Sequence, residues 1–173
     1  MSRRAGMENR SSSLVLPVYR LMTRALAPAV PMLLARREAR GKEDPARRGE
    51  RFGIASVERP PGILIWIHAA SVGESLSVLP LIDRLVSDAA APNILVTTGT
   101  VTSAKLMLDR LPMKAIHQFV PLDHPSYCGR FLDHWKPDLG VWVESEFWPN
   151  LIVEASGRNI PLALVNARIT ERS

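Results

Sequence analysis

Two glutamates are the residues best suited to acid–base chemistry, Glu74 in HAASVGES and Glu144 in VWVESEFWPN. A positioned carboxylate can take a proton from a hydroxyl group or stabilise positive charge that develops in a transition state. Each of the two follows an apolar run that is typical of a buried β-strand. If those strands are neighbours in a parallel sheet, both carboxylates face one crevice at the carboxyl ends of the strands.

The elements that must position these residues alternate regularly from Gly62 onward. Apolar runs predict strands over residues 63–69, 93–98, 115–120, 139–143 and 162–165. Helical spacing predicts helices over residues 75–86, 101–111, 125–135 and 149–156. This alternation predicts the α/β class, a Rossmann-like doubly wound parallel sheet. In its usual 3-2-1-4-5 order, the first and fourth strands are neighbours.

The two glutamates have different local settings. Glu74 falls in the first turn of its helix after Ser71, which can cap that helix. The positive end of the helix dipole favours an ionised carboxylate there, as a general base requires, although plain capping is the alternative interpretation. Glu144 shares its strand exit with Glu146, and alternation places the two on the same side. We expect the aromatic pair at 147–148 to wall a pocket beside them.

The positive charge of the chain lies in its N-terminal part. The net charge is +5, but residues 1–53 carry 12 Lys and Arg against 5 Asp and Glu, and the remainder carries 10 against 12. No aromatic residues interleave with the arginines as on a nucleic-acid stacking platform, so anionic lipid is the favoured partner over nucleic acid. The single cysteine, Cys128, excludes an internal disulfide and indicates a reducing compartment. We expect it to be a packed hydrophobe.

Residues 14–35 are apolar but interrupted. Arg20 and Arg24 divide the segment, and Pro17, Pro28 and Pro31 are expected to break any helix. A spanning helix needs about 20 apolar residues, roughly twice the uninterrupted run here. We predict an interfacial or weakly anchored helix, with a disordered arm as the alternative. The arginines expected to be available to anionic headgroups are Arg36, Arg37, Arg40, Arg47, Arg48 and Arg51.

Other candidate sites are weaker. His68 lies inside the first predicted strand, where a core histidine is expected, and the remaining histidines share no metal-ligand spacing. Residues 97–103, TTGTVTS, offer hydroxyl groups to a sugar or phosphate, or form an ordinary strand-to-helix turn. Neither a dinucleotide fingerprint, a P-loop nor a nucleophile elbow occurs.

Several short blocks, taken together and in order, resemble the N-terminal half of bacterial 3-deoxy-D-manno-octulosonic acid (Kdo) transferases over residues 47–173. These blocks are Gly49–Gly53, His68–Glu74, Thr97–Thr100, Pro121–Asp123, Glu144–Asn150 and Asn166–Arg168. The resemblance implies the GT-B architecture, in which two Rossmann-like domains face each other across a cleft. It also implies inverting transfer of Kdo from CMP-Kdo to the lipid A precursor, lipid IVA, at the cytoplasmic face of the bacterial inner membrane.

Residue by residue, the resemblance implies that Glu74 is the proton acceptor and Glu144 the transition-state stabiliser. It implies no cofactor and no catalytic metal. We therefore expect a membrane-associated segment over residues 1–46 and an acceptor-side domain over 47–173. The donor-binding domain is expected to be absent, so that the chain alone is inactive. Two alternatives remain open: a stand-alone module that binds an anionic lipid or sugar phosphate without catalysis, and a transferase that uses another nucleotide sugar.

Overall fold

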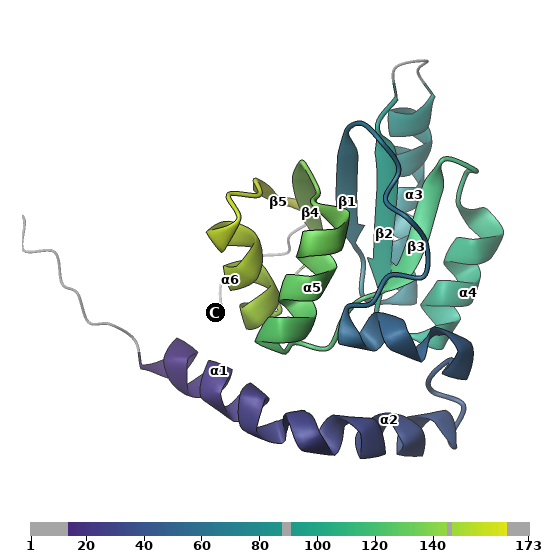
Figure 1. Ribbon diagram of the computed structural model, residues 1–173. Helices are drawn as coiled ribbons and strands as arrows, with labels where there is room; N and C mark the ends of the chain where they lie inside the picture. The colour runs from purple at the N-terminus through teal and green to yellow at the C-terminus, as the bar shows by residue number, and fades with distance from the viewer. Residues whose placement is uncertain (1–13, 88–90, 145–146, 166–173) are drawn as a thin grey trace, which may run out of the picture.

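The computed structural model describes residues 14–87, 91–144 and 147–165. After an N-terminal helical segment, strands and helices alternate along the chain (Figure 1), as the sequence pattern predicts. The strands are β1 (Leu64–His68), β2 (Asn93–Thr98), β3 (Ala115–Phe119), β4 (Leu139–Val143) and β5 (Leu162–Val165). The helices between them are α3 (Val72–Val86), α4 (Val101–Arg110), α5 (Pro125–Trp135) and α6 (Pro149–Gly157).

The strands form one parallel sheet in the order β3-β2-β1-β4-β5, which confirms the predicted fold class and strand order. β1 pairs with β2 on one side and with β4 on the other, so that His68 lies opposite both Thr97 and Trp142. The connections progress outward from β1 toward β3 and outward from β4 toward β5. The β1–β4 pair is therefore the topological switch point, outside which doubly wound sheets bind their ligands.

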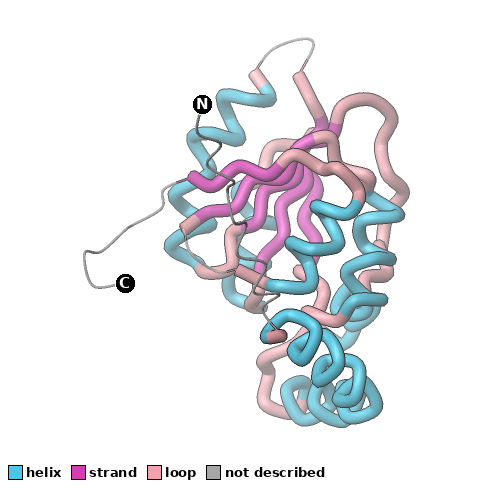
Figure 2. Tube along the Cα trace, turned by 90° about the vertical axis from the view of Figure 1, so that its left-hand side faces the viewer, coloured by secondary structure: helices cyan, strands magenta, loops and turns pink. Residues whose placement is uncertain are grey.

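Helices cover both faces of the sheet, which gives three layers (Figure 2). On one face, α5 and α6 bury a cluster centred on Trp66, whose ring lies 5.1 Å from that of Phe131 and 4.6 Å from that of Trp142. On the other face, α3 and α4 bury a cluster that contains Ile67 and Val96. Burial on both faces explains why the strands read as continuous apolar runs in the sequence.

The N-terminal segment forms an arm of two helices, α1 (Val15–Leu26) and α2 (Val30–Glu38), joined by the 3₁₀ turn η1 (Ala27–Ala29). Pro28 lies in this joint, whereas Pro17 and Pro31 lie in first helical turns, where a missing amide leaves no helical bond unmade. The expectation that all three prolines break the helix is therefore wrong. The disordered-arm alternative is also wrong for the described part of this segment.

The arm lies across the edge at which the strands end (Figure 1). Among the arm residues that the structure describes, Leu34 is the one buried apolar side chain, and polar groups fix the arm to the body: the hydroxyl of Tyr19 donates to Asp123 at 2.7 Å, and Arg20 pairs with Glu154 at 2.7 Å. Its exposed side chains are largely apolar, among them Val15, Val18, Leu21, Met22, Leu26, Met32 and Leu33. α1, none of whose described residues is buried, is thus the reverse of an ordinary surface helix, whose apolar stripe faces the core. Within the described residues, no helix is both long and apolar enough to span a bilayer.

Most of the arginines that were expected to reach lipid headgroups form ion pairs within the fold. For these arginines, the expectation of contact with headgroups is wrong. Carboxylates of the same segment hold them in the pairs Arg37–Glu43, Arg51–Glu43, Arg47–Glu50 and Arg48–Glu38. Arg36 and Arg40 form no ion pair with any residue that the structure describes, and both are exposed. The basic charge that the arm presents to solvent is thus smaller than the sequence suggests.

The 3₁₀ helix η2 (Pro45–Phe52) connects the arm to the sheet and ends at Gly53. Gly53 has a φ of +74°, in the left-handed region that favours glycine. A Cβ at this position would also overlap the backbone carbonyl oxygen of Tyr127 at the start of α5. The turn can therefore pack against α5 only with glycine at this position.

Replacing Gly53 with alanine is expected to lower the free energy of unfolding by about 2 to 5 kcal/mol, because a left-handed conformation and overpacking both oppose the side chain. Gly41→Ala is the matched control, since its φ is +66° but an added Cβ meets nothing within 4 Å. Gly41→Ala is expected to lower the free energy of unfolding by about 1 to 2 kcal/mol. Urea denaturation followed by circular dichroism measures both. Equal losses would contradict the packing argument.

Candidate active site

The turn after β1 holds Glu74 in the first turn of α3, as predicted from the sequence. Ser71 caps this helix, and its Oγ accepts a hydrogen bond from the backbone N–H of Glu74 at 3.3 Å. In return, Oε1 of Glu74 accepts from the Ser71 hydroxyl at 2.8 Å, and Oε2 accepts from the backbone N–H of Ala70 at 2.9 Å. The carboxylate is thus held in one orientation by donors from its own turn.

These contacts bear on the choice between capping and catalysis. Glu74 is only 6% exposed, and both of its carboxylate oxygens serve the end of the helix. Each oxygen of a carboxylate has two lone pairs, so one hydrogen bond apiece leaves capacity for a further donor. Glu74 therefore does cap the helix. The same contacts would hold its carboxylate in a fixed orientation if it also acts as a general base.

Glu144 directly follows β4, and its backbone N–H still donates to the carbonyl of Val165 on β5 at 3.0 Å. Its φ of +59° is left-handed, a conformation that costs a non-glycine residue about 1 to 3 kcal/mol and is concentrated at functional sites. Because β4 pairs with β1, Glu74 and Glu144 follow neighbouring strands and lie at the same edge of the sheet. The predicted alignment of Glu146 with Glu144 lies outside the described residues.

A hollow of about 260 Å³ opens at this edge, between the arm and the ends of the strands. Its walls include Ala70, Gly99, Thr100, Val120 and Trp148 from the body and Leu33 and Arg37 from the arm. Trp148 thus walls a pocket as expected, whereas Phe147 is 57% exposed and does not line this hollow. The side chains of Glu74 and Glu144 are not part of the lining, and Ala70 is the residue that connects the hollow to the Glu74 turn.

The turn after β2 is closed by hydroxyl groups. Thr100 caps α4 by accepting a hydrogen bond from the N–H of Ser103 at 3.1 Å, and the Ser103 hydroxyl accepts from the N–H of Thr100 at 3.3 Å. A Cβ at Gly99 would lie 3.1 Å from the carbonyl oxygen of Ala70, so the turns after β1 and β2 touch. The TTGTVTS stretch is therefore a strand-to-helix turn that also forms part of the wall of the hollow.

Two ion pairs, one buried and one partly buried, lie beneath this region, and their arginines, Arg51 and Arg47, were expected from the sequence to reach lipid headgroups instead. Arg51 donates to Glu43 at 2.8 Å and to the backbone carbonyls of Val120 and Gly99 at 3.2 and 2.8 Å. Burial lowers the pKa of Arg51, while the hydrogen bond to Glu43 raises it. Arg51 thus joins the arm-side carboxylate to the turns after β2 and β3.

Glu50 forms the second pair. It accepts from Nε and Nη2 of Arg47, each at 2.8 Å, and from the backbone N–H of Phe119 at 2.6 Å. The guanidinium groups of Arg47 and Arg51 lie 4.7 and 4.5 Å from the centroid of the Phe119 ring, close enough for cation–π attraction. The end of β3 is thus enclosed by charges that the helix η2 supplies.

Asp123 joins three parts of the fold. It accepts hydrogen bonds from the hydroxyl of Tyr19 at 2.7 Å and from the backbone N–H groups of Asn150 and Leu151 at 3.1 and 2.9 Å. Burial and this hydrogen bond raise the pKa of Tyr19. The amide of Asn150 in turn donates to the carbonyl of Asp123 at 2.7 Å and to the hydroxyl of Thr23 at 3.2 Å. The arm is thereby fixed to the start of α6, just after the turn that follows β4.

Two histidines are buried at the same end of the sheet. His68 is 1% exposed, and its Nδ1 lies 3.0 Å from the hydroxyl of Thr97, which confirms a core position. The Nδ1 of His117 accepts from Arg47 at 3.0 Å, so its Nε2–H donates to the hydroxyl of Thr98 at 2.9 Å. Burial lowers the pKa of His68 to about 4, and burial together with the nearby arginines lowers that of His117 to about 3. Both rings are therefore neutral at pH 7.

Comparison with known proteins identifies the family. A family model described as 3-deoxy-D-manno-octulosonic-acid transferase (kdotransferase) matches residues 46–173, most of the chain. The chain belongs to this family. The match confirms the resemblance seen in the sequence motifs, and it assigns the fold to the N-terminal region of Kdo transferases, which are glycosyltransferases of lipopolysaccharide biosynthesis.

Individual relatives agree with this assignment. A probable mitochondrial 3-deoxy-D-manno-octulosonic acid transferase of Arabidopsis thaliana is 44% identical over 90% of the chain and 35% of its own length. The 3-deoxy-D-manno-octulosonic acid transferase of Rickettsia bellii is 42% identical over 90% of the chain and 37% of its own length, and that of Haemophilus influenzae is 38% identical over 82% and 33%. The chain thus spans about a third of the length of these Kdo transferases.

Stability is expected to fall with acidification below pH 6.5. The unfolded histidines take up protons near pH 6.5, whereas folded His68 and His117 resist protonation down to about pH 4 and about pH 3. Above pH 6.5 neither state binds these protons, so the histidines make no contribution to pH dependence there. Below pH 6.5, each histidine is expected to lower the free energy of unfolding by up to about 1.4 kcal/mol per pH unit, until the pH reaches its pKa in the folded state.

Urea denaturation at pH 7, 6 and 5 measures this dependence. His117→Gln is expected to be less sensitive to acidification between pH 6 and 5 than the unaltered chain, because one of the two buried rings has been removed. An unchanged free energy of unfolding from pH 7 to pH 5 would contradict the assignment of neutral buried rings.

Proposed function

We propose that the chain is the acceptor-side part of a transferase that moves Kdo from CMP-Kdo to the lipid A precursor, lipid IVA. The observation that carries the proposal is the location of both motif glutamates at the carboxyl ends of the central strand pair in a member of the Kdo transferase family. That edge is where parallel α/β sheets bind their ligands. The hollow beside the Glu74 turn supports the same location for the acceptor.

In the proposed reaction, Glu74 accepts the proton of a primary hydroxyl of the acceptor sugar. The hydroxyl oxygen forms a bond to the anomeric carbon of Kdo as the bond between that carbon and the CMP oxygen breaks, and CMP leaves with the bonding electrons. Attack opposite the leaving group inverts the anomeric configuration. Glu144 stabilises the positive charge that develops on the sugar ring. The local hydrogen bonds of Glu74 support its role, because they fix the carboxylate before substrate arrives.

The proposed location is the cytoplasmic face of a bacterial inner membrane. The reversed polarity of the arm supports it, since an apolar exposed side next to Arg36 and Arg40 suits an anionic bilayer surface better than bulk water. The lipid precursor is then presented at the same edge of the domain as the two glutamates.

Glu74→Gln in the complete transferase is expected to lower kcat by about 10²- to 10⁴-fold, the usual contribution of a general base. The amide keeps an acceptor oxygen for the turn, so the midpoint of thermal unfolding should change little. Glu58→Gln is the matched control, because it removes the same charge from an exposed residue. Both variants are assayed by transfer of Kdo to lipid IVA.

Near-normal turnover by Glu74→Gln would show that Glu74 serves only as a helix cap. Its low exposure and its two capping contacts make this the relevant alternative. If the variant lost its turnover and also unfolded at lower temperature, circular dichroism would reveal the loss of structure.

The 173 residues alone are expected to show no Kdo transfer. We propose that the donor nucleotide sugar is bound mainly by residues beyond this region, because relatives in the family are about three times as long as the matched chain. The test compares the isolated chain with the complete transferase at equal concentration, using CMP-Kdo and lipid IVA. Measurable transfer by the isolated chain would overturn the assignment of donor binding to another region.

A further inference from the structure

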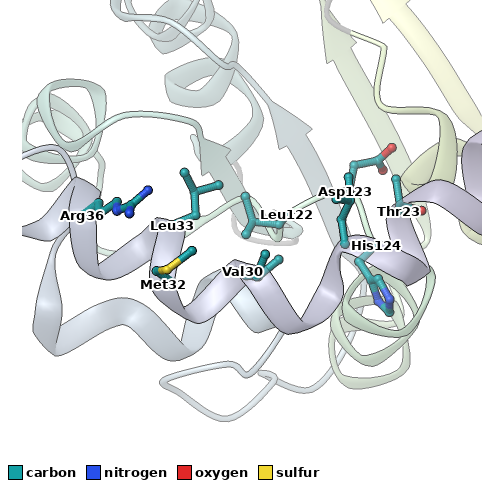
Figure 3. A pocket seen from close by; sticks show the side chains of 10 residues that line it. Thr23, Val30, Met32, Leu33, Arg36, Leu122, Asp123 and His124 are labelled. Carbon is teal, nitrogen blue, oxygen red and sulfur yellow. The ribbon is translucent and has the colours of Figure 1, made fainter.

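A second cavity separates the arm from the body and adjoins the hollow beside the Glu74 turn, with which it shares Leu33 and Leu122. It has a volume of about 390 Å³ and lies between the arm and the turn that leads from β3 into α5 (Figure 3). The apolar residues that line it are Leu26, Ala29, Val30, Met32, Leu33 and Leu122. The cavity runs along the arm as a groove, with Arg36 near one end and Thr23, Asp123 and His124 near the other.

The chemistry of this arm groove selects a hydrocarbon rather than a peptide. Its middle consists of aliphatic and thioether side chains, and the backbone of the arm is helical, so its amides bond within the helices. A peptide strand placed here would leave its own N–H and C=O groups without partners, at a high free-energy cost. A methylene chain has no such groups to satisfy and gains from leaving water.

The ends of the arm groove differ in charge. Asp123 is already bonded by Tyr19 and by the backbone at the start of α6, so its charge is stabilised within the protein. Arg36 forms no ion pair with any described carboxylate and is exposed. The groove therefore joins an apolar channel to an available cation, a combination complementary to a lipid with a negatively charged headgroup.

We propose that the arm groove binds one acyl chain of an anionic membrane phospholipid, with the lipid phosphate at Arg36. This goes beyond adsorption of the arm on a charged surface, because the chain enters between the arm and the body and contacts Leu122 on the far wall. It does not depend on transfer chemistry at Glu74. The groove selects a lipid that has both an acyl chain and an anionic headgroup. The outer side chains of α1 touch the membrane surface alone and cannot make this selection.

The test is photo-crosslinking of the full chain on vesicles that contain phosphatidylcholine and phosphatidylglycerol without any sugar acceptor. The phosphatidylglycerol carries a diazirine near the end of one acyl chain, and mass spectrometry locates the adducts. Adducts on both walls, at Val30 and at Leu122, are expected, and of the two cavities Val30 lines only this one. Adducts confined to the outer residues Val15 and Val18 would overturn the proposal, since they would show surface adsorption only.

A pair of variants separates the arm groove from the arm surface. Ala29→Phe fills the groove and is expected to abolish adducts at Leu122, whereas Ala25→Phe adds the same ring to an exposed residue outside the lining and should leave them unchanged. Circular dichroism confirms that both variants fold. Persistence of the Leu122 adducts in Ala29→Phe would overturn the proposal.

Two further measurements test the headgroup and the competing occupant. Arg36→Gln is expected to weaken binding of the phosphatidylglycerol probe about fivefold, the effect of one basic residue near an anionic surface, and to weaken binding of a phosphatidylcholine probe less, because the choline cation offsets the charge of its phosphate. Equal loss for both probes would contradict the assigned preference for a net anionic headgroup, and no loss for either would contradict the phosphate position. A stable dimer by light scattering that protects Leu122 from the probe would show that a second copy of the chain occupies the groove, and would overturn the proposal.

Discussion

The parallel pairing of β1 with β4 is the interaction on which the candidate active site depends. Residues 68 and 142 lie opposite each other in this pair, so the segments that carry Glu74 and Glu144 leave the sheet side by side although 70 residues separate them in the sequence. Burial of Trp66 and Trp142 against α5 and α6 on one face, and of Ile67 against α3 and α4 on the other, holds the pair in register. A one-residue slip would turn these side chains to the wrong faces.

The arm is part of this arrangement because polar contacts fix it over the same edge. Glu43 joins the arm side to Arg51 and so to the turns after β2 and β3, and Asp123 joins Tyr19 to the start of α6. These contacts engage polar side chains of the arm, while many of its apolar side chains remain exposed. The membrane contact that we propose and the contacts that fix the arm over the crevice thus involve different side chains of the same segment.

The sheet order, the class of fold and the helix that carries Glu74 could be predicted from the sequence because they follow from local periodicity. The arm could not, since the effect of a proline depends on its position within a turn, and Pro17 and Pro31 fall where helices tolerate it. The roles of Arg51 and Asp123 depend on partners far along the chain. Their only signal was their presence in blocks shared with the Kdo transferase family. The left-handed backbone of Glu144 leaves no signal in residue type, because glutamate rarely adopts it.

The left-handed backbone of Glu144 bears on which residues position 144 can accept in engineered or homologous sequences. Glycine at position 144 would relieve the unfavourable φ and would also remove the glutamate side chain with its interactions. Under the catalytic role that we propose for Glu144, the left-handed glutamate is an activity–stability trade-off, in which backbone stability is lost in exchange for the side chain.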